Sequence, residues 1–156
     1  MNYLTVITMD SLLNNEGLVS CIAYQILKER PCDFSKLSIL LSLLMDDQIR
    51  AYVMCKDSLF FEDSIFRNER PEFLERIYLE MLPVCLNSMV ILIQNYIVET
   101  DNNVLKLTEK GRAFADDISL IGSRRLENIS KDVPFIIQLT ENYSAADLFK
   151  SLKLSV

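Results

Sequence analysis

The sequence predicts a single, mainly α-helical domain that carries one short β-hairpin. Apolar residues recur at spacings of three and four along most of the chain, which is typical of helices that bury one face. The exception is the segment 97–107, where two short runs of strand-forming residues flank polar residues that favour a turn. Only three Gly and four Pro occur in 156 residues, so we expect no long flexible linker.

The N-terminal residues predict an extended arm followed by a helix. Residues 3–8 are rich in β-branched and aromatic side chains, which favours a short strand or an extended arm. A helix is then expected from a cap at Asn14 or Asn15 to about Arg30, since Pro31 disfavours helical backbone in the residue before it.

A second helix is predicted from Lys36 to about Met45, after a cap at Asp33 or Ser35. This helix is apolar on nearly every side. Such a helix is either central in its domain or covered by a partner, and we favour the central position. Residues 46–68 predict no single type of element, because their apolar residues could extend a helix or form a strand.

Two further helices are predicted on either side of Pro83. Pro71 suits the first turn of a helix, and apolar residues follow it at helical spacing as far as Met81. Pro83 has no N–H group and its ring clashes with the preceding turn, so we expect it to break or restart the helix. A separate helix is then predicted over residues 84–95.

The hairpin is predicted with strands at 97–100 and 104–107, because the residues 101–103 between them, Asp-Asn-Asn, tolerate positive φ. Thr108 is expected to cap a short helix. The pattern is helical again over 119–142, with a restart near Pro134. A last helix is expected over residues 145–152 after a cap at Ser144, with Leu148, Phe149 and Leu152 on its inner face.

Helix, helix, strand, tight turn and strand is the order of a winged-helix unit. The segment 107–111, Leu-Thr-Glu-Lys-Gly, resembles the Leu-Thr-x-x-Gly with which the wing of many winged-helix proteins closes. We therefore predict a mainly α, winged-helix-type domain with a short two-stranded wing. The single domain 1–156 would contain an N-terminal arm and helices (1–70), the winged-helix unit (71–118) and C-terminal helices (119–156).

The charge distribution argues against DNA binding by this unit. The formal net charge is −6, and no Lys or Arg occurs from Val84 to Leu105, the region that would enter a major groove. Groove-reading helices normally present basic or amide side chains, and basic residues hold the phosphates. We therefore expect protein contact and no duplex DNA binding by the chain alone. A winged-helix DNA-binding transcriptional regulator is the alternative interpretation.

The composition also disfavours catalysis. The chain has no His, which removes the commonest general base and the commonest metal ligand. The four cysteines have none of the spacings typical of zinc or redox sites, so we interpret them as reduced core residues: Cys21, Cys32, Cys55 and Cys85. We expect no enzymatic activity, no cofactor and no metal.

The N-terminus, Met1-Asn2-Tyr3-Leu4, lacks the basic region of a signal peptide, and no uninterrupted apolar run reaches about 18 residues. We therefore expect a cytoplasmic protein without a membrane segment. Candidate interface residues are an aromatic cluster and the wing, chosen because aromatic residues and strand edges are suited to protein contact. They are Phe60, Phe61, Phe66, Thr100, Asp101, Asn102, Asn103 and Val104.

Four segments, which together cover almost the full length of the chain, carry a resemblance to a known family. They are NNEGLVSCIAYQILKE (14–29), FSKLSILLSLLMDDQIR (34–50), the stretch from ERPEFLERIYLE to LKLTEKG (69–111) and SAADLFKSLKLSV (144–156). Their order and spacing resemble the middle components of bacterial three-component ABC systems, as in Lamassu-type anti-phage defence. Members often have Leu-His after the second helix, where this chain has Leu44-Met45-Asp46-Asp47, so a contact made by that His would be absent or replaced.

The resemblance implies a non-catalytic accessory subunit of a hetero-oligomeric complex. Its partners would be an SMC-like ABC ATPase and an effector subunit, such as a nuclease. The subunit would help to hold the effector against the ATPase and to regulate its release.

Overall fold

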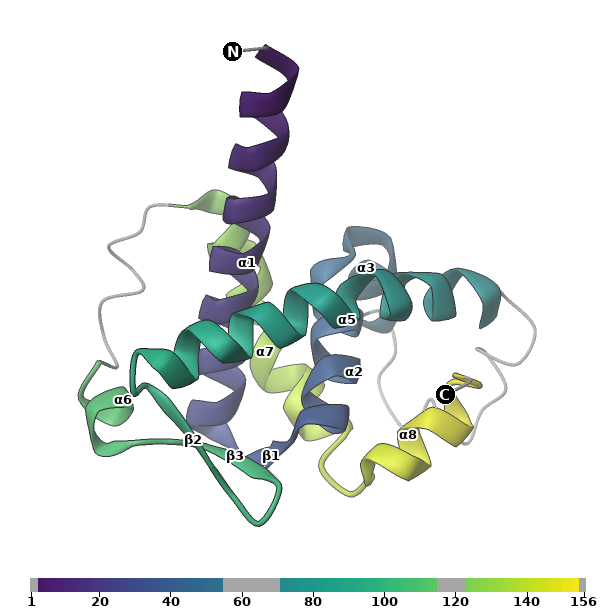
Figure 1. Ribbon diagram of the computed structural model, residues 1–156. Coiled ribbons are helices and arrows are strands. Elements are labelled where there is room, and N and C mark those ends of the chain that lie inside the picture. Colours follow the sequence, from purple (N-terminus) through teal and green to yellow (C-terminus); the bar gives the residue numbers. More distant parts are fainter. Residues whose placement is uncertain (1–2, 55–70, 115–122, 155–156) are drawn as a thin grey trace.

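The computed structural model describes residues 3–54, 71–114 and 123–154, which are mainly helical with a small three-stranded antiparallel sheet (Figure 1). This confirms the predicted mainly α class. The helices are α1 (Tyr3–Glu29), α2 (Phe34–Met45), α3 (Asp47–Met54), α5 (Pro71–Gln94), α6 (Glu109–Ala113), α7 (Arg124–Leu139) and α8 (Ala145–Ser151). The strands are β1 (Cys32–Asp33), β2 (Val98–Asp101) and β3 (Val104–Leu107).

The expected extended arm at residues 3–8 is wrong, because these residues are the first turns of α1. This single helix continues to Glu29, and its N-terminal part projects away from the rest of the chain (Figure 1). The β-branched residues that favoured a strand cost a helix only a few tenths of a kcal/mol each, about as much as ordinary residues. No Pro interrupts the segment, so a helix formed further along can extend through it.

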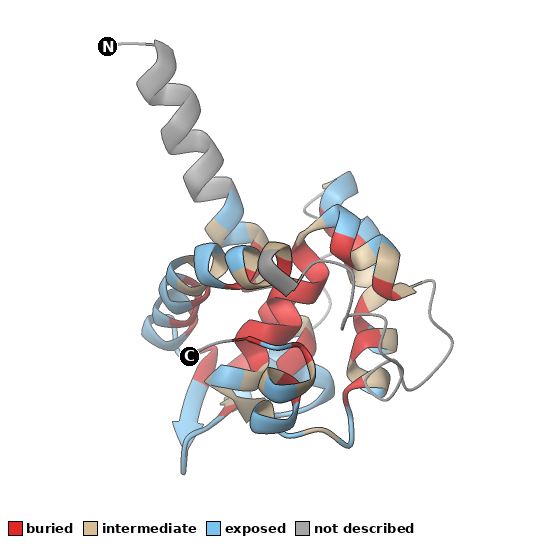
Figure 2. Cartoon of the chain, turned by 90° about the vertical axis from the view of Figure 1, so that its right-hand side faces the viewer, coloured by how far each residue is buried: buried red, intermediate tan, exposed pale blue. Residues whose placement is uncertain are grey.

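Helix α2 is central, as predicted. The Oδ1 atom of Asp33 accepts a hydrogen bond of 2.8 Å from the backbone N–H of Lys36, so Asp33 is the cap. Every residue from Leu37 to Met45 is buried, beneath α1, α3, α5, α7 and α8 (Figure 2). The hydroxyl of Ser42 donates to the carbonyl of Ser38 within the helix, which satisfies the polar atom inside this apolar core.

The region for which no element type was predicted begins with α3. The Oδ1 atom of Asp46 accepts from the N–H groups of Gln48 and Ile49 and thereby caps this helix. Arg50 fixes α3 to its neighbours, because its guanidinium donates to the carbonyl of Leu44 at 2.6 Å and pairs with Asp132 of α7 at 3.2 Å. Residues 55–70 lie outside the described part of the chain.

Helix α5 begins at Pro71, as expected, but it does not break at Pro83. It continues through this residue as one helix of 24 residues. Pro83 is on the exposed side of α5, so the carbonyl of Leu79, which loses its helical N–H partner there, also faces the exposed side. Helix α7 likewise continues through Pro134, which is exposed too. Both predicted breaks are therefore wrong for the same reason.

The predicted hairpin is confirmed, and the sheet contains one strand that the sequence did not predict. Asn102 and Asn103 have φ values of 50° and 65° and form the turn between β2 and β3. The strand order is β1-β3-β2, with Cys32 of β1 opposite Leu105 of β3. A strand of two residues carries no periodic pattern, which is why β1 was missed. Through β1, the sheet joins the connection between α1 and α2 to the hairpin.

The Leu-Thr-Glu-Lys-Gly segment locks the hairpin to α1. The Thr108 side chain caps α6 by accepting from the N–H of Gly111 at 2.9 Å. The Cα of Gly111 lies so close to the backbone carbonyl of Ile97 that a Cβ would overlap it, so only Gly fits. The Tyr24 hydroxyl of α1 donates to the carbonyl of Gly111 at 2.8 Å. The Leu-Thr-Glu-Lys-Gly sequence is therefore explained by the close packing of backbone segments at this point.

The C-terminal helices close the other side of the core. Ser144 caps α8 in a capping box with Asp147, as predicted from its position before the helix. Leu148 is fully buried, and its neighbour Phe149 makes an edge contact with the ring of Tyr78, with centroids 5.5 Å apart. The Nζ of Lys36 donates to the carbonyls of Thr140 and Tyr143 at 3.0 and 2.7 Å, which ties α2 to the end of α7.

Candidate protein-binding surface

Helix α5 has two apolar faces, of which the fold covers one. The inner face packs on α1 and α2 and includes buried Leu74, Tyr78, Cys85, Met89 and Leu92. The opposite face is exposed, and we call its five residues the outer stripe: Leu79, Pro83, Leu86, Val90 and Ile93. Leu79 and Leu86 are 53% and 55% exposed, and Val90 and Ile93 are 43% and 41% exposed.

The outer stripe has the spacing of a coiled-coil seam. Its residues follow one another at intervals of four, three, four and three, which keeps them on one line along a helix. At a rise of about 1.5 Å per residue, the stripe from 79 to 93 is about 21 Å long. Large apolar side chains at single surface positions are ordinary, but a continuous line of them is typical of an interaction site.

The stripe also lies within an uncharged stretch. From Met81 to Val98 the sequence contains no charged residue, and no Lys or Arg occurs from 77 to 105. The charges at the start of the stripe are an ion pair: Arg76 precedes Leu79 by three residues on the same line, and its Nε lies 3.8 Å from the Oε1 of Glu80. This pair is exposed, so the interaction contributes little to stability.

Helix α1 crosses α5 beside the stripe and adds a second carboxylate. The side-chain amide of Asn87 donates to the Oε1 of Glu16 at 2.9 Å, and the hydroxyl of Ser88 donates to the Glu16 carbonyl at 3.2 Å. Asn87 and Glu80 are seven residues apart, so they lie on the same flank of α5. Glu16 and Glu80 therefore border the stripe on the side of α1.

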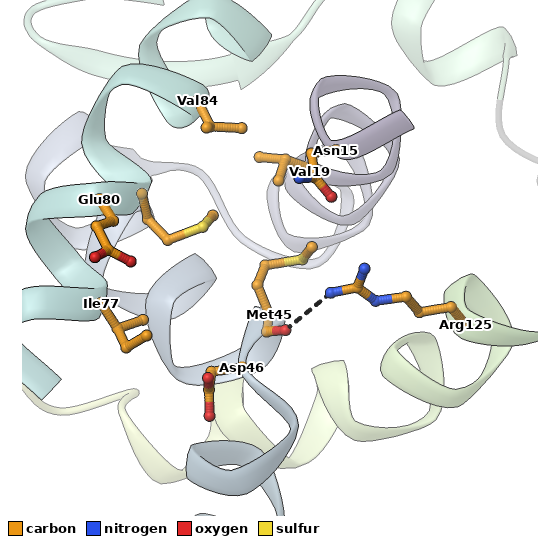
Figure 3. A pocket seen from close by; sticks show the side chains of 9 residues that line it. Asn15, Val19, Met45, Asp46, Ile77, Glu80, Val84 and Arg125 are labelled. Atoms are coloured by element: carbon orange, nitrogen blue, oxygen red, sulfur yellow. Dashed lines mark hydrogen bonds between the residues drawn. The ribbon is translucent and has the colours of Figure 1, made fainter. Parts of the chain in front are cut away.

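A pocket of about 140 Å³ opens on the side of α5 that faces α1, away from the stripe, between α1, α5, the end of α2 and the start of α7 (Figure 3). Apolar side chains form much of its wall, and polar groups stand around it. The Arg125 guanidinium donates to the carbonyl of Met45 at 3.4 Å. An apolar cavity of about this volume holds a single benzene molecule, so the pocket has the size for one side chain. Its lining residues are Asn15, Val19, Met45, Asp46, Ile77, Glu80, Met81, Val84 and Arg125.

Two exposed aromatic residues lie beyond the C-terminal end of the stripe. Tyr96 is 73% exposed and has a φ of 58°, in the turn that leads from α5 into β2. Phe114 is 56% exposed, although its ring makes an edge contact with Tyr24 at 6.4 Å. Aromatic residues are enriched at protein interfaces, so Tyr96, two residues after the end of α5, suits protein contact at this end of the helix.

The wing residues predicted from sequence are exposed, but they form a separate and polar surface. All five, Thr100 to Val104, are exposed, and Val104 only moderately, at 37%. The Nζ of Lys106 lies 3.0 Å from Asp101 and 3.7 Å from Glu99, and the hydrogen bond to Asp101 raises the pKa of this lysine. The predicted aromatic cluster, Phe60, Phe61 and Phe66, lies outside the described residues.

The outer stripe was missed in the sequence because a helix break was expected at Pro83. Once α5 is known to be continuous, the alternation of four and three from Leu79 to Ile93 identifies its outward face. The missed pattern was present in the sequence, but two predicted helices divided it between them.

The three cysteines within the described residues, Cys21, Cys32 and Cys85, are free thiols, and Cys55 lies outside the described part of the chain. Burial raises the pKa of Cys32 and of Cys85 to about 12, and it also raises the pKa of Cys21. Within residues 3–54, 71–114 and 123–154, no group of three or more His, Cys, Asp or Glu side chains is placed to hold a metal ion.

Comparison of the chain with protein-family models found no match, and searches against curated proteins and solved structures found none either. Among the described residues, one helical segment, Phe73–Gln94, is long and apolar enough to cross a bilayer by length and composition, with a mean hydropathy of 1.6. Core helices of globular proteins meet the same criterion, and the inner face of α5 is packed in the core.

Proposed function

We propose that this chain is a cytoplasmic, non-catalytic accessory subunit of a bacterial anti-phage complex, in which it bridges an SMC-like ABC ATPase and an effector such as a nuclease. The sequence resemblance to the middle components of three-component ABC systems supplies the class of partners. The outer stripe is the observation that carries the proposal. An exposed, uncharged apolar seam along a peripheral helix of 24 residues is expected of a subunit that functions in contact with another protein.

A winged-helix interpretation of the fold supports this proposal. The chain order α1-β1-α2, then α5-β2-β3, and the sheet order β1-β3-β2 agree with a winged-helix unit that carries extra residues between α2 and α5. In this interpretation β2 and β3 form the wing, and α5 occupies the position of the helix that reads DNA in regulators. The unit would then include α1 and α2, in addition to residues 71–118.

The alternative, a DNA-binding transcriptional regulator, requires that α5 present polar and basic groups to bases and phosphates. Its outward face instead presents Leu, Val and Ile side chains. The nearest cation on the wing, Lys106, is paired with Asp101 and Glu99. DNA phosphates would repel an acidic chain that lacks cations on this surface, so protein binding is the better-supported function.

The test is co-expression of the chain with the proteins encoded beside its gene, followed by affinity purification and size-exclusion chromatography. We expect a stable complex that contains an ATPase and an effector. Leu86→Glu in the outer stripe should remove the chain from the complex, whereas Gln138→Glu on the exposed side of α7 adds the same charge and should not. Purification of the chain alone, together with tight salt-dependent binding to duplex DNA, would favour the regulator.

A further inference from the structure

We infer that the outer stripe is the seat for an amphipathic helix of the partner, which carries apolar residues at heptad spacing and a basic residue on one flank. This inference rests on the proposed function and names the chemistry of the segment that binds there. The juxtaposition that carries it is an uncharged heptad seam bordered on one side by two carboxylates, those of Glu80 and Glu16.

The spacing of the stripe selects a helix as the bound element. Knobs-into-holes packing needs apolar residues that repeat every 3.5 residues on both helices, and the intervals from Leu79 to Ile93 have this repeat. An extended segment would need a free strand edge to supply its backbone hydrogen bonds. Apart from the Leu79 carbonyl that Pro83 leaves without a helical partner, the outer face of α5 offers no such groups, because the N–H and C=O groups of a helix interior bond to one another. A second helix needs no such bonds.

The carboxylates select the charge of the partner. Glu80 stands on the flank next to the stripe, and Glu16 lies beside Asn87, which is seven residues or about two turns further along. A helix that lay on the stripe would place its own flanking residues opposite this edge. Lys or Arg there would gain an opposite charge, whereas Glu or Asp would meet like charges, which costs binding free energy.

The same charges disfavour a second copy of this chain as the occupant. The helix of a second copy has no Lys or Arg between residues 77 and 105, so it offers no cation to Glu80 or Glu16 along the length of the stripe. Two chains that each carry a net charge of −6 would also repel one another. Helices that lie on a membrane surface usually carry Lys or Arg on their polar face, and α5 lacks them over this length.

Photo-cross-linking of the co-purified complex tests this inference. The photoreactive residue p-benzoylphenylalanine replaces Val90 in one variant and Gln138 on α7 in the control, and mass spectrometry maps the attached peptide. We expect Val90 to cross-link to one partner segment with apolar heptads and a flanking Lys or Arg. A cross-link to residues 79–93 of another copy, to lipid, or to a segment without heptads would overturn the inference. A complex that does not form at all refutes the proposed function instead.

Charge reversal provides the second measurement, with the purified partner titrated against the chain. Glu80→Lys should raise the Kd about tenfold or more, since a favourable charge contact becomes a repulsive one. Glu127→Lys on α7 is the matched control, because Glu127 is exposed and far along the sequence from the stripe. Equal Kd values for the two variants would overturn the assignment of a basic flank, and would leave the complex itself intact.

Discussion

Helices α2 and α5 are both apolar around most of their circumference, yet the fold treats them differently. Helix α2 lies between five other helices, and all its residues from Leu37 to Met45 are buried. Helix α5 lies at the periphery and packs mainly on α1 and α2, so its inner face is buried and the outer stripe remains exposed. Apolar character alone therefore does not distinguish a core helix from a helix that exposes an apolar binding face. The position of the helix in the tertiary structure distinguishes the two.

Truncation in α2 should have the largest effect on stability. Leu41 is fully buried, so Leu41→Ala leaves a cavity that its neighbours cannot fill, and the free energy of unfolding should fall by about 2–5 kcal/mol. Urea denaturation followed by circular dichroism measures this change. A loss below about 1 kcal/mol would mean that α2 is less tightly enclosed than its burial indicates.

Whether the inner face of α5 is closed to water can be tested through the effect of Cys85 on how the free energy of unfolding changes with pH. Its pKa is raised to about 12 by burial, from an ordinary value of 9.0. The unfolded chain therefore loses this proton first, and the stabilising contribution, fully present below pH 9.0, is lost as pH rises toward 12. The slope reaches about 1.4 kcal/mol per pH unit for one thiol.

The matching comparison is Cys85→Ala, measured by urea denaturation between pH 8 and pH 10.5. Tyrosines and lysines also titrate in this range, and the variant retains them. Stability should consequently fall more steeply with pH in the original chain than in the variant. Parallel pH profiles would show that solvent reaches this thiol and that the inner face is not closed.

A smaller effect is expected at Ser88, the polar residue of the inner face. Its hydroxyl donates to the carbonyl of Val84 at 2.7 Å and reaches the Glu16 carbonyl at 3.2 Å. Ser88→Ala removes these interactions, and the free energy of unfolding should fall by about 0.5–1.5 kcal/mol. Thermal unfolding compares the variant with the original chain. No measurable change would mean that water or backbone bonds already satisfy these carbonyls.

The smallest effect on stability, and the sharpest contrast with Leu41, is expected for Leu86→Ala in the outer stripe. Leu86 is 55% exposed, so the substitution should change the free energy of unfolding by no more than about 0.5 kcal/mol. Binding of the partner should nevertheless weaken about tenfold or more, as at interface positions that become buried in the complex. If stability falls as much as in Leu41→Ala, the stripe is part of the fold and not an interface.

The sequence predicted those features of the fold that depend on local chemistry. The cap at Asp33, the Asn102-Asn103 turn and the cap at Thr108 each follow from a side chain that bonds a backbone group or tolerates positive φ nearby. The central position of α2 was also predicted, because a helix without a polar face has few other stable places.

Features that depend on tertiary context were not predictable in the same way. The effect of Pro83 depends on which side of α5 faces solvent, and β1 exists because β3 lies beside two residues that have no strand pattern of their own. The outer stripe combines both difficulties. Its spacing is local, but only the packing of α5 decides which apolar face remains uncovered.

The ties of α2 to the C-terminal helices have a consequence for synthesis. Lys36 bonds to the carbonyls of Thr140 and Tyr143, and α8 covers part of α2, so residues made long after α2, 104 positions beyond Lys36 at Thr140, complete the enclosure of this helix. Until α7 and α8 emerge, a nascent chain carries an apolar helix without its cover, which favours aggregation or capture by chaperones. Premature stop codons upstream of α8 should therefore yield insoluble or degraded protein, even though they spare the whole surface of α5.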